Sequence, residues 1–154
     1  MKLTLLCVGK LGASPESGLA KDWARRATQT GRASGFGPVE IVEIEPRKGG
    51  RAAEAEALIR RFGTGMIIAC DERGQAMRSR AFADHLARLR DDGVQHVTLV
   101  IGGADGLDAS VLDRASLVLA FGPQTWPHAL ARAMLAEQVY RAATLMAGLP
   151  YHRD

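Results

Sequence analysis

A run of glycines follows a strongly apolar segment in the second half of the chain. Residues 97–101 read Val-Thr-Leu-Val-Ile, which is typical of a buried strand, and Gly102, Gly103 and Gly106 occupy three of the next five positions. Glycine lets the backbone turn sharply and bring its N–H groups close to another molecule. Since ligands of open α/β sheets bind beyond the carboxyl ends of the strands, this loop is a candidate binding site. A tight strand-to-helix turn without a ligand explains the same residues equally well.

The spacing of these glycines, G-G-x-x-G, differs from two familiar phosphate-binding patterns. The dinucleotide-binding loop reads G-x-G-x-x-G and normally follows the first strand, whereas this loop follows the fourth predicted strand. The phosphate loop of nucleotide hydrolases ends in Lys followed by Ser or Thr, and neither follows Gly106. The glycines therefore do not identify a ligand by themselves.

The chain ends in three residue types that could act on a nucleotide. Tyr151 offers an aromatic ring for stacking, His152 titrates near neutral pH, and Arg153 can hold a phosphate with two hydrogen bonds. A short polar tail is by default frayed and without function. This combination nevertheless contains what is needed to hold a nucleotide and to move a proton.

A second glycine-containing turn follows the fifth predicted strand. It comprises Phe121, Gly122, Pro123, Gln124, Thr125 and Trp126. The polar segment 71–75 is predicted as a loop at the end of the third strand. Because the carboxyl ends of parallel strands meet at one edge of a sheet, these two segments and the glycines at 102–106 are expected to form one pocket lined by backbone. This convergence favours a binding site over separate structural turns.

Alternating strand and helix patterns supply the elements that position these residues. Strands are predicted at residues 2–8, 39–44, 66–70, 97–101 and 116–121, and helices at residues 15–31, 52–62, 109–114 and 127–147, with a further helix that ends at Gly93. Five repeated βα units predict an α/β fold, a parallel sheet with helices on both faces. The pattern alone favours a flavodoxin-like or Rossmann-like strand order.

The sequence predicts the location of several side chains within these elements. Leu19, Trp23 and Ala27 recur at helical spacing and predict the buried face of the first helix. His85, among charged neighbours, is predicted to be a surface histidine. Arg132 lies one helical turn after His128, near the pocket end of the last helix.

The two cysteines and the glycine pair at residues 49–50 are best explained without a ligand. Cys7 and Cys70 lack metal-binding spacing and are predicted to be reduced core residues. The segment 48–51 reads Lys-Gly-Gly-Arg and could bind phosphate, but a flexible connection is favoured because no apolar strand leads directly into it.

Length and composition limit the possible classes of protein. With 154 residues, 47% hydrophobic and 24% charged, the chain is expected to be one globular domain with a real core. No apolar run approaches the roughly 20 residues of a membrane span, and the short run at 3–8 lacks a signal-peptide cleavage motif, so a cytoplasmic protein is expected. A net charge of +3 permits an anionic partner without requiring one. Only four of the 20 basic residues are lysine; this excess of arginine suits phosphate contacts, and equally a habit of the source genome.

Four segments of the chain resemble the RlmH family, a group of small bacterial SPOUT methyltransferases. The segments occupy residues 101–107, 125–128, 137–142 and 150–153, in that order. The resemblance covers the whole chain, although its specificity lies mostly in the C-terminal part. It implies a single SPOUT domain over residues 1–154, with a C-terminal trefoil knot in approximately residues 95–154, and a homodimer.

The resemblance also implies S-adenosylmethionine as the cofactor and assigns residues to its site. The expected cofactor-binding residues are Cys70, Gly102, Gly103, Gly106, Phe121, Gly122, Pro123, Gln124, Thr125 and Trp126. Relatives commonly carry leucine at the position of Cys70, lysine at that of Gln75, and glutamate or asparagine at that of Asp105. These differences could shift cofactor affinity, but no proposed catalytic group is missing.

The implied reaction is methylation of N3 of a pseudouridine in helix 69 of 23S rRNA, on assembled 70S ribosomes. We hypothesise that His152, or a water it orients, accepts the N3 proton. Arg153 and Arg132 would steady the developing anion or the RNA phosphates, and Tyr151 would pack on the base. The tail would complete the site across the dimer interface, and neither a metal nor a membrane is expected to take part. The alternative is a non-catalytic α/β module that binds a nucleotide or RNA through the same loops.

Overall fold

The computed structural model describes residues 1–46 and 49–151, in which strands and helices alternate as the sequence predicts. The elements are β1 (Lys2–Val8), α1 (Pro15–Gly31), a short 3₁₀ helix (Arg32–Ser34), β2 (Val39–Ile44), α2 (Arg51–Ile59), β3 (Met66–Ala76), α3 (Ser79–Asp91), β4 (His96–Ile101), α4 (Ala109–Leu112), β5 (Leu117–Ala120) and α5 (His128–Met146). The expected α/β class is confirmed. No helix in the described ranges is long and apolar enough to cross a membrane.

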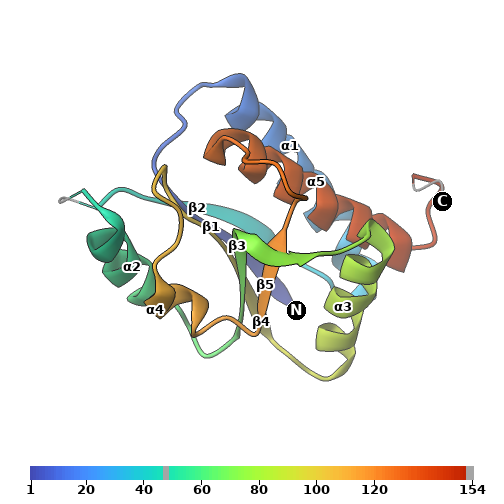
Figure 1. Ribbon diagram of the computed structural model, residues 1–154. Coiled ribbons are helices and arrows are strands. Elements are labelled where there is room, and N and C mark those ends of the chain that lie inside the picture. The colour runs from blue at the N-terminus through green and yellow to red at the C-terminus, as the bar shows by residue number, and fades with distance from the viewer. Residues whose placement is uncertain (47–48, 152–154) are drawn as a thin grey trace.

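The five strands form one parallel sheet in the order β2-β1-β4-β3-β5. Helices α1, α3 and α5 cover one face, and α2 and α4 cover the other (Figure 1). The flavodoxin-like and Rossmann-like orders suggested by the pattern are wrong, because β3 lies between β4 and β5. In the flavodoxin-like order β3 lies beside β1, and in the Rossmann-like order it lies beyond β2. The central position of β4 agrees with its burial, since all of its residues after His96 are buried.

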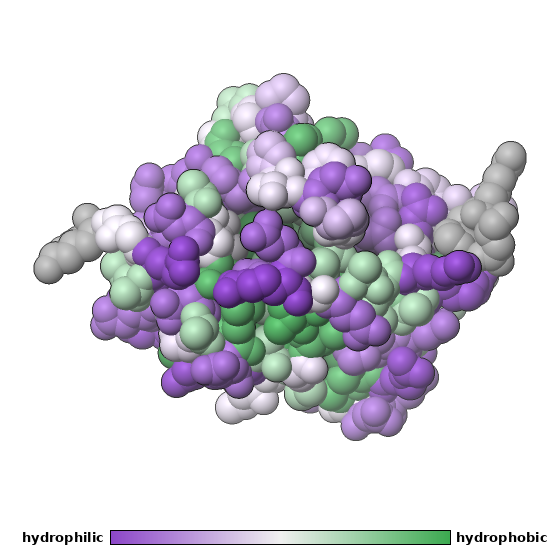
Figure 2. Space-filling model, in the orientation of Figure 1, coloured by the Kyte–Doolittle hydropathy of each residue, from purple (hydrophilic) through white to green (hydrophobic). Residues whose placement is uncertain are grey.

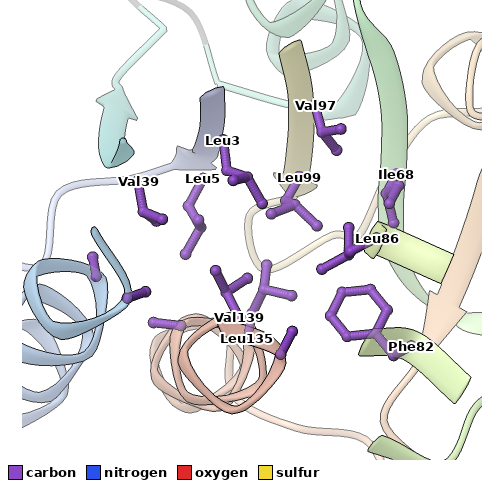
Figure 3. Packing of buried hydrophobic residues seen from close by; sticks show 14 of the residues in the cluster. Leu3, Leu5, Val39, Ile68, Phe82, Leu86, Val97, Leu99, Leu135 and Val139 are labelled. Carbon is purple, nitrogen blue, oxygen red and sulfur yellow. The ribbon is translucent and has the colours of Figure 1, made fainter. Parts of the chain in front are cut away.

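Alternating residues of the central strands build a core on each face of the sheet. Leu3 and Leu5 of β1 point toward α5, where they meet Leu135 and Val139 (Figure 3). The next residue, Leu6, points to the opposite face and packs with side chains of α2 and α4. This alternation is the two-residue period of a strand covered on both sides.

The start of α1 agrees with the sequence prediction, but its buried face differs. The Ser14 side chain accepts a hydrogen bond from the backbone N–H of Ser17 at 3.1 Å, and Pro15 is the first helical residue. The prediction for Leu19 is wrong, because this residue is 51% exposed. Ala20 and Ala24 are buried instead, and their small size lets α1 lie close against α5.

The predicted end of the third strand at Cys70 is also wrong. β3 continues to Ala76, and both Cys70 and Gln75 pair with Leu119 of β5. Residues 71–74 therefore form a bulge rather than a free loop. The sequence pattern did not indicate this bulge, because its residues are polar and lack the apolar character of the preceding strand residues. Pairing with β5 resumes at Gln75 and so extends β3.

His85 and the two cysteines are partly or fully buried. His85 is half-buried rather than at the surface; its Nε2 atom has no hydrogen-bond partner in the described part of the chain, and burial lowers its pKa. Cys7 and Cys70 are free thiols, as expected. Burial raises the pKa of Cys7 to about 12 and raises that of Cys70 as well. Both pair with Ile101, from opposite sides, so they lie two strand spacings apart, about 10 Å, too far for a disulfide.

Candidate functional site

A cavity of about 690 Å³ opens at the carboxyl ends of β4 and β5, beside the bulge of β3. This volume lies within the range of pockets that hold small molecules. The three segments that the sequence predicts to form one pocket do meet at this cavity, although segment 71–75 belongs to the bulge of β3 and is not a loop. Nine of the ten residues expected to bind a cofactor line it: Cys70, Gly102, Gly103, Gly106, Phe121, Gly122, Gln124, Thr125 and Trp126. Pro123 is not among the lining residues, although both of its neighbours are.

Residues 102–107, here called the glycine loop, close tightly on themselves. The backbone N–H of Gly106 donates to the carbonyl of Gly103 at 3.1 Å, and Gly106 has a φ of 73°. A Cβ on Gly102 would lie 3.0 Å from the backbone of Gly106, and one on Gly103 would lie 2.9 Å from the Glu54 carboxylate oxygens. Close packing against backbone therefore requires glycine at position 102, and the positive φ favours it at position 106. The contact of Gly103 with Glu54 shows that the loop lies against α2.

The loop after β5 forms the opposite wall of the cavity. Gly122 has a φ of 101°, and the Trp126 indole donates to the carbonyl of Phe121 at 3.2 Å. The Thr125 hydroxyl donates to the Glu72 carboxylate at 3.2 Å, which links this loop to the bulge of β3. Trp126 remains 41% exposed and so keeps an accessible apolar surface at the cavity.

The cavity has walls of mixed chemistry. Arg51 and Arg73 contribute positive charge, and Asp71, Glu72 and Asp105 contribute negative charge. Apolar walls come from Ile101, Leu119, Phe121 and Trp126. In the orientation of Figure 1, Figure 2 shows apolar surface between hydrophilic side chains on the face that β3 and β5 present. The arrangement suits a ligand with a flat apolar ring and charged groups of both signs.

Some lining residues were not among the predicted site residues. Arg51 is the first residue of α2, so the segment favoured as a flexible connection leads directly to the cavity. Asp71 and Arg73 belong to segment 71–75, which was expected at the pocket, but the bulge of β3 that brings them there was not predicted. His128 lines the cavity at the start of α5. Among the described residues, no group of three or more His, Cys, Asp or Glu side chains could hold a metal ion.

Arg132 occupies a different environment from the one hypothesised. It is only 1% exposed, does not line the cavity, and forms an ion pair with Glu43. Its guanidinium also donates to the carbonyls of Val8 at 3.2 Å and Gly9 at 3.0 Å. Because its hydrogen bonds join α5 to the ends of β1 and β2, Arg132 has a structural role here and presents no surface to a nucleotide.

Tyr151 also lies away from the cavity of its own chain. Its hydroxyl donates to Glu137 at 3.0 Å, and its ring centre is 4.8 Å from that of Tyr140. Burial and the Glu137 carboxylate raise the pKa of Tyr151. Glu137 follows His128 by nine residues, or about 14 Å along α5. His152 and Arg153, which were hypothesised to act together with Tyr151, lie outside the described residues.

Comparisons with known proteins agree with this architecture. A family model described as "Predicted SPOUT methyltransferase" matches residues 1–152. A protein of Caulobacter vibrioides named "Ribosomal RNA large subunit methyltransferase H" is 63% identical over 154 residues, which cover 100% of this chain and 99% of the relative. A protein of Caulobacter sp. with the same name is 64% identical and is matched over 100% of both chains.

A solved structure shares the fold at much lower sequence identity. It is described as "a probable methylase family protein from Haemophilus influenzae Rd KW20". The TM-score is 0.56 at 12% identity, and the match covers 99% of this chain and 70% of the other. At this identity the similarity concerns the fold alone.

Proposed function

The chain belongs to the RlmH family of SPOUT methyltransferases, and from this premise we propose that it methylates N3 of a pseudouridine in helix 69 of 23S rRNA. S-adenosylmethionine is the proposed methyl donor. The observation that carries the proposal is the cavity itself, because the positions to which the family resemblance assigns donor binding converge on it from three separate strands. The alternative of a non-catalytic module would use the same cavity without a reaction.

The residues of the cavity fit such a donor in size and chemistry. Phe121 and Trp126 offer apolar surface for an adenine ring, and Gly102 and Gly103 line the cavity without side chains. Asp105 and Arg51 provide opposite charges for the charged groups of the methionine portion. When bound, the donor supplies an activated methyl group on a sulfonium, so the protein mainly has to position the acceptor.

The acceptor nitrogen requires the loss of a proton. N3 of pseudouridine is a weakly acidic imide N–H, whose lone pair becomes available only as that proton leaves. We assign the acceptance of this proton to His152, or to a water that it orients. Arg153 would stabilise the developing negative charge, and Tyr151 would pack on the base. Arg132 would hold the ends of β1 and β2 in place rather than contact RNA.

The position of Tyr151 supports a homodimer in this proposal. Tyr151 contacts Glu137, apart from the cavity of its own chain, so a tail that acts on the acceptor would serve the cavity of a second copy. Leu19 of α1 and Leu130 of α5 are exposed on helices that pack against each other, which supports an interface on this side. The knot expected in approximately residues 95–154 belongs to the same proposal. An assembled 70S ribosome as the acceptor implies that the enzyme acts in the cytoplasm.

Removal of residues 151–154 distinguishes the enzyme from a binding module. We expect the truncated protein to bind S-adenosylmethionine with wild-type affinity and to lose methyl transfer to ribosomes, since the cavity is intact and the acceptor site is not. Calorimetry and transfer of a labelled methyl group measure the two properties. If the truncated protein kept the function of the intact protein, the non-catalytic module would be favoured, because that module needs only the cavity.

A further inference from the structure

The bulge of β3 is held in place by close contact with β5. Cys70 and Gln75 both pair with Leu119, so residues 71–74 leave the ladder between two points that are fixed by the sheet. A Cβ on Gly74 would lie 2.6 Å from the carbonyl oxygen of Val118, and backbone cannot move aside as a side chain can. The backbone of the bulge is therefore held in one position at the edge of the cavity.

Asp71 is the almost completely buried side chain of this bulge. Its side chain is 6% exposed, although it is ionisable and lies beside a cavity. One carboxylate oxygen accepts hydrogen bonds from the backbone N–H of Arg73 at 3.0 Å and from its Nε at 2.7 Å. The other accepts from Arg73 Nη2 at 2.9 Å. Hydrogen bonds from the side chain and the backbone of Arg73, with a smaller one from the backbone of Leu107, hold the pKa of Asp71 below its usual range.

The same pair reaches across to the glycine loop. Arg73 Nη2 also donates to the carbonyl of Leu107 at 3.3 Å. Leu107 ends the glycine loop and is itself 2% exposed, packed in the core beneath α2 and α4. An exposed ion pair contributes little to stability, but a two-point contact on a buried carboxylate fixes orientation more firmly. Asp71, Arg73 and Leu107 thus connect the bulge to one end of the glycine loop.

We propose that Asp71 is a positioning residue of the methyl-donor site, which acts through Arg73 and Leu107 to hold the glycine loop in its binding conformation. The inference rests on the proposed function, because the glycine loop is taken to be part of the donor site. If the loop visits other conformations without this clamp, the apparent donor affinity falls by the fraction of protein that is competent to bind. Saturating donor restores the competent conformation.

The variant Asp71→Asn tests the clamp, with Glu56→Gln as the matched control. Glu56 forms an exposed ion pair with Arg60 on α2 and does not line the cavity. We expect Asp71→Asn to raise Kd and KM for S-adenosylmethionine about tenfold, since it weakens charged hydrogen bonds, and to leave kcat at saturating donor unchanged. Glu56→Gln should leave all three constants unchanged. A variant that merely unfolds in part would instead lower kcat at unchanged KM.

Amide hydrogen exchange in the donor-free protein provides the second readout. We expect faster exchange of the amides of residues 103–107 in Asp71→Asn than in the wild-type protein or in Glu56→Gln. Arg73→Gln breaks the same ion pair by changing its exposed partner. This variant should also show faster exchange and weaker donor binding. This variant tests the clamp even if Asp71→Asn does not fold.

Two results would overturn the inference. Wild-type donor affinity in Asp71→Asn would show that the clamp does not position the loop. Weaker donor binding without faster exchange would mean that Asp71 contacts the donor directly instead. Because the exchange measurement needs no donor, it tests the clamp separately from the function. A wild-type protein that binds no S-adenosylmethionine would contradict the proposed function and leave the exchange result to decide on the clamp.

Discussion

Adjacent glycines of the glycine loop differ in what a methyl group would meet. A Cβ at Gly102 would lie 3.0 Å from backbone atoms of Gly106, whereas one at Gly103 would meet the flexible end of Glu54. Because backbone cannot move aside as a carboxylate can, we expect Gly102→Ala to weaken donor binding by about tenfold or more and Gly103→Ala to weaken it less. Calorimetric titration with S-adenosylmethionine measures both. An equal or larger effect at Gly103 would contradict the assigned geometry.

The assignment of His152 as the proton acceptor leads to a prediction about pH. An imidazole accepts a proton only in its neutral form, so the wild-type rate should rise as the pH increases from acid values. We expect His152→Ala to slow single-turnover methylation and to remove this rise. Rates measured from acid to alkaline pH on unmodified ribosomes test it. A variant with unchanged rates at every pH would exclude His152 as the base.

At the scale of elements, local sequence signals predicted the bounds of a strand or helix correctly where residues within or next to that element end it. The bounds of β1 and β2 are as predicted, because short apolar runs end at Gly or Pro signals, and α1 begins at its Ser14 cap. The extension of β3 could not be predicted, because its polar residues join the sheet only through β5. The burial of Arg132 could not be predicted either, since Glu43 is distant in sequence.

The ion pair of Arg132 connects α5 to two strands and has a consequence for stability. Removal of Arg132 would leave the Glu43 carboxylate and the carbonyls of Val8 and Gly9 without their donor, so we expect Arg132→Ala to lower the free energy of unfolding by about 3–5 kcal/mol. The exposed control Arg60→Ala should cost about 1 kcal/mol or less. Urea unfolding followed by circular dichroism measures both. A small, equal loss in the two variants would show that the pair of Arg132 and Glu43 does not hold these elements together.

At the scale of the whole molecule, the sequence predicted the fold class and the common edge where the loops meet. It did not predict the strand order, because nothing local in β3 or β4 indicates which of them lies beside β1. The location of Tyr151 depends on its packing against Tyr140 and Glu137, which likewise follows from the folded chain. Contacts between distant segments, rather than residue types, decided these features.

Net charge leads to a prediction about the acceptor. A formal charge of +3 is small for an enzyme that grips RNA by electrostatic attraction alone. We therefore expect recognition of a folded ribosomal surface, with methylation of assembled 70S ribosomes and much slower methylation of free 23S rRNA. Parallel assays with ribosomes, separate subunits and free RNA measure the preference. Equal rates on free RNA or on a short stem-loop would contradict it.

We propose above that this chain transfers a methyl group to one pseudouridine of the large ribosomal subunit. The most direct test is transfer of a labelled methyl group from S-adenosylmethionine to purified 70S ribosomes that lack the modification. We predict label in 23S rRNA and its loss when uridine replaces the target pseudouridine. Donor binding without any transfer of label to these ribosomes would contradict the claim and point to a different acceptor or to a non-catalytic module.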